Sequence, residues 1–190
     1  PDDWLSGVYL GKLTAKKVGE TNGAIHFQFE LGADWTVPGT VMTPVKARGT
    51  SLLVADQGRK AQTARVKALL DSGQRVVAID PFIFGESKIK RRDFLHVLLV
   101  HAVGERALGI QSSQIAGIAN WAKKEFGGPV QLTSVGPRLS VAARIAAVQT
   151  DAISGVELHQ PMKSLKSVIK ENKGANHLPE MMCFGLLEYF

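Results

Sequence analysis

The chain has 190 residues, of which 45% are hydrophobic and 21% are charged. This length and composition suit one compact domain over residues 1–190, and they exclude an intrinsically disordered chain, which contains far fewer apolar residues. Cys183 is the single cysteine, so an internal disulfide is excluded, and no cluster of His and Cys has metal-ligand spacing. We therefore expect no metal and no cofactor.

The formal net charge is +6, and the densest basic run is Lys-Ile-Lys-Arg-Arg at residues 88–92. Clustered basic residues can bind phosphate groups, but this run lacks the interleaved aromatic residues of nucleic-acid sites. We interpret it as a solvated loop or helix start and predict no nucleic-acid partner. No apolar run reaches the roughly 18 residues of a membrane helix, so we predict no membrane partner. The compartment stays open, with a processed chain that is secreted or periplasmic as one alternative.

The N-terminal part is rich in predicted strands. Residues 24–54 predict extended structure, because Ile25, Phe27 and Phe29 alternate with polar neighbours and further apolar runs follow after Gly and Pro turns. This part therefore forms a β-rich start to the domain.

From residue 59 onward, strands and helices alternate. Short apolar runs without alternation are typical of strands that are covered on both faces in a parallel sheet. The predicted strands are residues 51–55, 75–80, 130–134 and 153–158. Helical spacing predicts helices over residues 59–70, 93–103, 111–126, 137–148, 162–171 and 179–190. The predicted fold class is α/β, with a mostly parallel twisted sheet and helices on both faces.

The loop after the second of these strands reads Asp80-Pro81-Phe82-Ile83-Phe84-Gly85-Glu86-Ser87. It resembles the Asp-x-x-Gly-x-Gly-x-Ser signature after the fourth strand of α/β-hydrolases, with Ile83 where glycine is commoner. The order of elements over residues 24–190 is similar to that of the acetyl xylan esterase and dienelactone hydrolase branch. The resemblance implies a three-layer α/β-hydrolase-like fold and a site for ester hydrolysis.

The nucleophile motif of that family is altered in this chain. In α/β-hydrolases a serine stands on a sharp strand-to-helix turn within Gly-x-Ser-x-Gly. In the register that we favour, Ser134 and Arg138 replace the two glycines and Gly136 occupies the nucleophile position. The next residue, whose N–H contributes to the oxyanion hole in the family, is Pro137, which has no N–H. This register predicts a chain without hydrolase activity.

A second register is shifted by two residues and makes Ser134 the nucleophile. Val135 then donates the oxyanion N–H, and Gly136 is the small residue after the turn. Leu132 would occupy the first small position, where its side chain would crowd the turn.

Other candidate site residues lie at the ends of predicted strands. Asp56 and Gln57 lie where the family carries its oxyanion loop. Asp80 and His159 form a candidate ligand pocket, because ligands bind at the carboxyl ends of parallel strands, although Asp80 is more simply explained as a residue that caps the following turn. The acid and histidine of the triad are expected beyond Phe190, so the domain is expected to be incomplete at its C-terminus.

Two functions remain in play. The first is a catalytically inactive hydrolase-like domain that acts as a binding or structural module for carbohydrate or a small ester. The alternative is an active serine carboxylic-ester hydrolase that uses Ser134 on acetylated carbohydrate. A nucleotide-binding protein is disfavoured, because no glycine-rich phosphate loop follows a predicted strand. An uncovered strand at residues 153–158 would favour a homo-oligomer or the remainder of a longer polypeptide.

Overall fold

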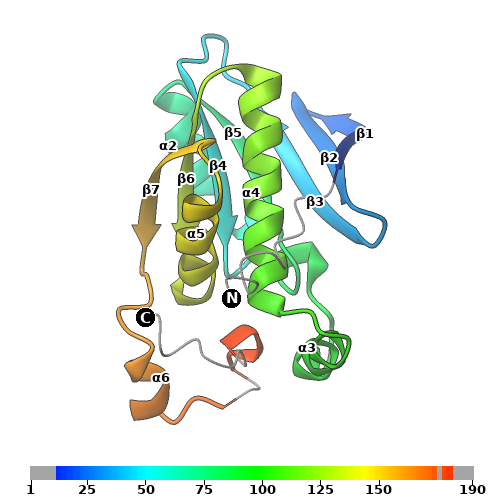
Figure 1. Ribbon diagram of the computed structural model, residues 1–190. Helices are drawn as coiled ribbons and strands as arrows, with labels where there is room; N and C mark the ends of the chain where they lie inside the picture. Colours follow the sequence, from blue (N-terminus) through cyan, green and yellow to red (C-terminus); the bar gives the residue numbers. More distant parts are fainter. Residues whose placement is uncertain (1–11, 175–176, 182–190) are drawn as a thin grey trace.

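The computed structural model describes residues 12–174 and 177–181. One sheet of seven strands runs through the molecule in the order β1-β2-β3-β5-β4-β6-β7 (Figure 1). The strands are β1 (Leu13–Thr21), β2 (Ala24–Leu31), β3 (Trp35–Met42), β4 (Gly49–Ala55), β5 (Gln74–Ile79), β6 (Val130–Val135) and β7 (Ile153–His159). The predicted α/β class with a mostly parallel core is confirmed.

The parallel half of the sheet consists of β5, β4, β6 and β7, which pair in parallel with their neighbours. These are the four strands that the sequence predicted, with bounds that differ by at most two residues. The apolar run of β4 is buried on both faces, since Leu52, Leu53 and Val54 are all fully buried. In β7, in contrast, Ile153 is the one buried residue. Within the described residues, β7 pairs with β6 alone and lies at the end of the sheet.

The antiparallel half consists of β1, β2 and β3, and β3 joins the parallel half through β5. The sequence predicted extended structure only from residue 24 and therefore missed β1. No residue of β1 is buried, and a register shift between Lys17 and Gly19 interrupts its alternation. An exposed edge strand of this kind has no apolar pattern strong enough to predict it.

Helices cover both faces of the sheet, as predicted. Figure 1 shows α4 (Ala107–Phe126) and α5 (Pro137–Gln149) in front of the sheet and α2 (Thr63–Asp71) behind it. The larger apolar core lies on the α4 and α5 side, and a smaller core packs Val66 of α2 against the opposite side of β4 and β5. None of the described helices is long and apolar enough to cross a membrane.

The remaining helices are short and differ in part from the predicted ones. The predicted helix at residues 59–70 splits into the 3-10 turn η1 (Arg59–Gln62) and α2, and α3 (Asp93–Ala102) agrees with its prediction. The predicted helix at 162–171 shrinks to α6 (Lys166–Lys170), because the Ser164 hydroxyl accepts the Lys166 N–H at 3.1 Å and the helix begins only after Ser164. Of the predicted helix at 179–190, the described part is the 3-10 turn η3 (Pro179–Met181), and the rest lies outside the described residues.

Asp80 organises the loop that follows β5. Its buried carboxylate accepts the backbone N–H groups of Arg59 at 2.7 Å and Glu86 at 3.0 Å, and it pairs with the Arg59 guanidinium. The Ser87 hydroxyl donates to the Asp80 carbonyl at 2.8 Å. The carboxylate therefore ties the loop after β4 to the loop after β5, which includes the turn η2 (Gly85–Ser87).

Ile83 has a backbone conformation that explains why the family signature carries glycine at this position. Its φ is +62°, in the left-handed region that glycine adopts at no cost and a β-branched side chain disfavours. Two buried glutamines of α4 hold the neighbouring peptide: Gln114 accepts the Phe82 N–H at 2.8 Å, and Gln111 donates to the Phe82 carbonyl at 3.2 Å. These contacts and the burial of Ile83 compensate for its backbone strain.

We expect Gly85→Ala to destabilise the domain strongly, because an added Cβ would overlap the Asp80 carboxyl group at a φ of +51°. Gly23→Ala is the matched control, since Gly23 has a φ of +77° but nothing within 4 Å of the added carbon. The control should cost about 1 kcal/mol of unfolding free energy, and Gly85→Ala at least about 2 kcal/mol more. Urea denaturation measures both; equal costs would show that the Asp80 loop is not tightly packed.

Candidate functional site

The turn between β6 and α5 is the place where an α/β-hydrolase carries its nucleophile. One residue, Gly136, makes this turn, with φ 106° and ψ 159°, and α5 begins directly at Pro137. The Gly136 N–H donates to the His159 carbonyl at 2.8 Å, which ties the turn to the end of β7. The positive φ favours glycine at this position.

The carboxylate of Asp56 fills the space beside this turn. Asp56 follows β4 and accepts the N–H of Arg138 at 2.9 Å and the N–H of Leu139 at 2.8 Å. A Cβ built on Gly136 would overlap the Asp56 carboxyl group. The first free N–H groups of α5 are therefore occupied by a side chain of the same chain, and the turn has no room for a side chain of its own.

Two of the backbone groups expected at an oxyanion hole, those of Pro137 and Asp56, offer no free N–H. Pro137 has no N–H to donate. The N–H of Asp56, in the loop after β4, donates to the Val135 carbonyl at 2.9 Å. Gln57, the other predicted oxyanion-loop residue, is exposed. Neither Pro137 nor Asp56 thus offers a free N–H to an oxygen at Gly136.

Ser134 lies two residues before the turn, inside β6. It is opposite Val54 of β4 and Leu158 of β7, and its side chain is fully buried. Its hydroxyl has no hydrogen-bond partner among the described residues. A hydroxyl in this position cannot reach a substrate in solvent without a change in the register of β6.

Arg138 and Glu180 form a clamp over the turn that the sequence did not predict. The Arg138 guanidinium donates two hydrogen bonds of 2.6 Å to the buried Glu180 carboxylate, from Nε to Oε1 and from Nη2 to Oε2. It also lies 4.5 Å from the centre of the Phe84 ring, within range of a cation–π contact. The clamp fixes η3 against the start of α5. A position 42 residues away supplies the carboxylate, so no local pattern indicates the pair.

The surroundings of Asp56 shift its ionisation. Burial raises the pKa of the Asp56 carboxyl above its ordinary value, although the N–H groups of Leu139 and Arg138 act in the opposite direction. The nearby negative charge of Glu180 adds to the upward shift, and the positive charge of Arg138 opposes it. Desolvation is thus the dominant influence on this carboxyl group.

The structure places Asp80 and His159, the two residues of the predicted ligand pocket, in contacts within the chain. The Asp80 carboxylate is buried and already accepts hydrogen bonds from its own loops. The His159 Nε2 lies 2.8 Å from the Arg65 guanidinium and 2.7 Å from the Glu157 carboxylate. A single nitrogen cannot accept from the one and donate to the other at the same time, so only one of these contacts is a hydrogen bond. The structure assigns both residues to internal contacts.

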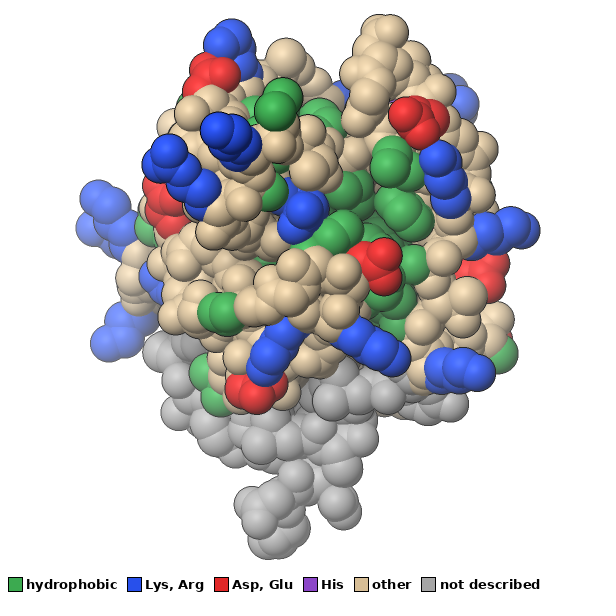
Figure 2. Space-filling model, turned by 90° about the horizontal axis from the view of Figure 1, so that it is seen from above, with side chains coloured by type: hydrophobic (Ala, Val, Ile, Leu, Met, Phe, Trp, Pro, Cys, Tyr) green, Lys and Arg blue, Asp and Glu red, His purple; other side chains and the backbone are tan. Residues whose placement is uncertain are grey.

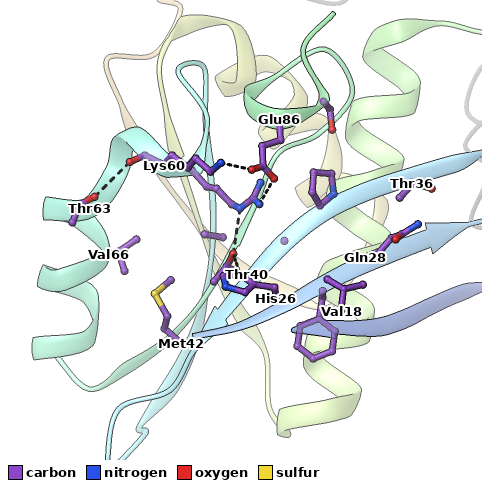
Figure 3. Close-up of a pocket in the computed structure, with 16 residues that line it drawn as sticks. Val18, His26, Gln28, Thr36, Thr40, Met42, Lys60, Thr63, Val66 and Glu86 are labelled. Atoms are coloured by element: carbon purple, nitrogen blue, oxygen red, sulfur yellow. Dashed lines mark hydrogen bonds and ion pairs between the residues drawn. The ribbon is translucent and has the colours of Figure 1, made fainter. Parts of the chain in front are cut away.

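A groove of about 870 Å³ lies instead on the α2 side of the sheet, away from the turn. Figure 3 shows α2 on one side of it, and strands β2 and β3 on the other. Figure 2, seen from above, shows a hollow with hydrophobic side chains inside it and basic side chains around it. The residues that line the groove are Val18, His26, Phe27, Gln28, Thr36, Pro38, Gly39, Thr40, Met42, Arg59, Lys60, Thr63, Val66, Ala78, Glu86 and Ser87.

Polar contacts cross this groove. The Thr40 hydroxyl lies 3.2 Å from Nδ1 of His26 and accepts from Nε of Arg59 at 3.3 Å. Arg59 and Lys60 both pair with Glu86 (Figure 3). The described residues contain no group of three His, Cys, Asp or Glu side chains placed to hold a metal ion.

Comparisons with known proteins show which solved structures this chain is similar to. No protein-family model matches the chain, and no curated protein matches its sequence. Solved structures do match. Acetyl xylan esterase 1 from Thermoanaerobacterium sp. JW/SL YS485 has a TM-score of 0.66 at 13% identity, over 93% of this chain and 64% of that protein. A highly thermostable carboxyl esterase from Bacillus coagulans has a TM-score of 0.55 at 16% identity, over 85% of this chain and 56% of that protein.

A proposed acetyl xylan esterase from Bacteroides fragilis matches with a TM-score of 0.60 at 13% identity, over 81% of this chain and 52% of that protein. The chain thus spans between about half and two thirds of the length of these three structures. The chain has an α/β-hydrolase-like fold, and its structural neighbours include acetyl xylan esterases, as the sequence resemblance predicted.

We expect Asp56→Ala to destabilise the domain by about 1–2 kcal/mol, the usual cost of removing a side chain that caps the start of a helix. Asp151→Ala is the control, because Asp151 is exposed and caps no helix. Urea denaturation at neutral pH measures both, and equal stability of the two variants would show that Asp56 does not hold the turn.

The raised pKa of Asp56 also predicts a pH dependence. Between the ordinary pKa of about 4 and the raised value, the folded chain binds more protons than the unfolded chain. The contribution of Asp56 to stability is therefore largest at low pH and is lost as the pH rises through the raised pKa. Asp56→Asn should remove this component, so the ratio of unfolding constants between variant and parent should change with pH in that window. A constant ratio would contradict the direction of the shift.

Proposed function

We propose that this chain is an α/β-hydrolase-like domain that does not hydrolyse esters and serves as a binding or structural module. One observation carries the proposal: the Asp56 carboxylate occupies the space beside Gly136 and accepts the N–H groups at the start of α5. In a working hydrolase of this fold, that space belongs to the serine side chain and to the oxygen that becomes negatively charged.

The expected losses in turnover are large enough to distinguish an active site from an inactive one. Loss of one oxyanion-hole donor costs on the order of a hundredfold to a thousandfold in turnover. Gly136 additionally removes the nucleophile, and with it the covalent route. The fixed negative charge of Asp56 would further repel a developing oxyanion at the same place. These effects act at one turn and all oppose catalysis.

The alternative is a serine esterase for acetylated carbohydrate that uses Ser134. The esterases among the structural neighbours favour it, as does the unpaired Ser134 hydroxyl. Against it, the residue is fully buried within a strand that is paired on both sides. Bringing Ser134 to the turn would require a shift of β6 by two residues, and that shift would break its hydrogen bonds with β4 and β7.

For a binding module, the groove beside α2 is the candidate site for a carbohydrate or small ester ligand. Its volume of about 870 Å³ lies within the usual range for small-molecule sites. Apolar side chains such as Met42 and Val66 could contact the apolar face of a sugar ring, and Thr40, His26 and Gln28 supply hydrogen-bonding groups.

Active-site labelling tests the proposal. The purified chain should take up no fluorophosphonate probe and release no p-nitrophenol from p-nitrophenyl acetate above the rate of the Ser134→Ala variant. The physical reason is the absence of an accessible serine at the turn. Stoichiometric labelling that disappears in Ser134→Ala would establish the serine esterase instead.

A further inference from the structure

Helix α3 carries an exposed apolar face. Leu95, Leu98, Leu99 and Val103 are 39%, 46%, 65% and 77% exposed. Their spacing of three and four residues places them on one side of α3 and its C-terminal end, whereas Val97 points into the core. Four large apolar side chains on one short helix are more than the scattered exposed leucines that need no explanation.

A basic loop leads directly into this helix. Lys88, Lys90, Arg91 and Arg92 are all exposed, and they precede the first residue of α3. The acidic residues nearest in sequence are Glu86, Asp93 and Glu105. Asp93 and Glu105 are half-buried, and the exposed Glu86 pairs with Arg59 and Lys60. The exposed apolar face of α3 and these four basic residues are called the α3 surface below.

We propose that the α3 surface binds the surface of an anionic lipid bilayer. Helices that lie in a membrane interface combine an apolar face with Lys and Arg beside it, and the leucines enter the boundary of the acyl chains while the cations bind lipid phosphates. The α3 surface has both parts on adjoining residues. This peripheral contact revises the prediction of no membrane partner, which rested on the lack of a membrane-crossing run, because it requires no membrane-crossing helix among the described residues.

The charge and the position of α3 favour a lipid surface over other partners. A second copy of the chain would bring an equal net charge of +6 to the interface, and the repulsion between like charges disfavours it. Figure 1 shows α3 at the lower right, clear of the sheet. A projecting apolar helix suits a soft interface into which it can sink, and the surrounding cations suit negatively charged headgroups.

Vesicle co-sedimentation with the full chain tests the proposal. The chain should bind vesicles of phosphatidylcholine with about one third phosphatidylserine, and it should bind pure phosphatidylcholine at least about tenfold more weakly. High salt should also weaken binding, because it screens charges at this range. Equal binding to both vesicle types would overturn the proposal.

Matched variants separate the two parts of the α3 surface. Lys90→Gln with Arg91→Gln removes two cations, each worth roughly fivefold in partitioning, so about a 25-fold loss is expected. Leu98→Gln with Leu99→Gln should reduce binding at least about tenfold through the lost apolar contact. Val45→Gln with Lys46→Gln is the control, since both residues are exposed in the loop after β3 at the opposite end of Figure 1, and it should bind like the parent chain.

Circular dichroism must show the same fold for all variants, and light scattering reports their oligomeric state. Binding that survives the leucine substitutions would show an ionic contact only and would overturn the proposal. A dimer that the leucine substitutions dissociate, in a chain that does not bind vesicles, would assign the α3 surface to a second copy and would also overturn it.

Discussion

The contact between the Asp56 carboxylate and the start of α5 is the constraint on which the site depends. The first turn of a helix has free N–H groups and a partial positive charge, and both favour an anion. Here the anion is a side chain of the preceding loop, held by Arg138 and Leu139. Gly136 and Asp56 therefore depend on each other, because a side chain at 136 would displace the carboxylate, and without it the N–H groups would lose their acceptor.

The parts of the fold that the sequence predicted are those in which local pattern and burial agree. Strands β4 and β5 were predictable because a strand covered on both faces needs a nearly continuous apolar run. Strand β1 was not, because none of its residues is buried and its alternation is interrupted. The predicted helix at residues 162–171 was too long, since the Ser164 hydroxyl accepts the Lys166 N–H and the helix begins only after Ser164.

The candidate site also has features that the sequence predicted and contacts that it could not predict. The identities of Gly136 and Pro137 are local, so a turn without a side chain at residue 136 and without an N–H at residue 137 could be predicted once the strand and helix were predicted. The Asp56 carboxylate reaches α5 across 82 residues of sequence, and Glu180 reaches Arg138 across 42. Such contacts depend on how strands are ordered in the sheet, so the sequence could place Asp56 in the loop but could not predict its partner.

Asp56 and Asp80 make the same kind of contact with backbone N–H groups of the chain. Both follow parallel strands at the carboxyl edge of the sheet, where ligands usually bind. Each carboxylate accepts two N–H groups of its own chain, Asp56 from the start of α5 and Asp80 from the loops after β4 and β5. The N–H groups of Arg59, Glu86, Arg138 and Leu139 at this edge are thus satisfied internally. The groove beside α2 and the α3 surface, in contrast, keep polar or apolar groups open to solvent, and this physical reason directs attention to them.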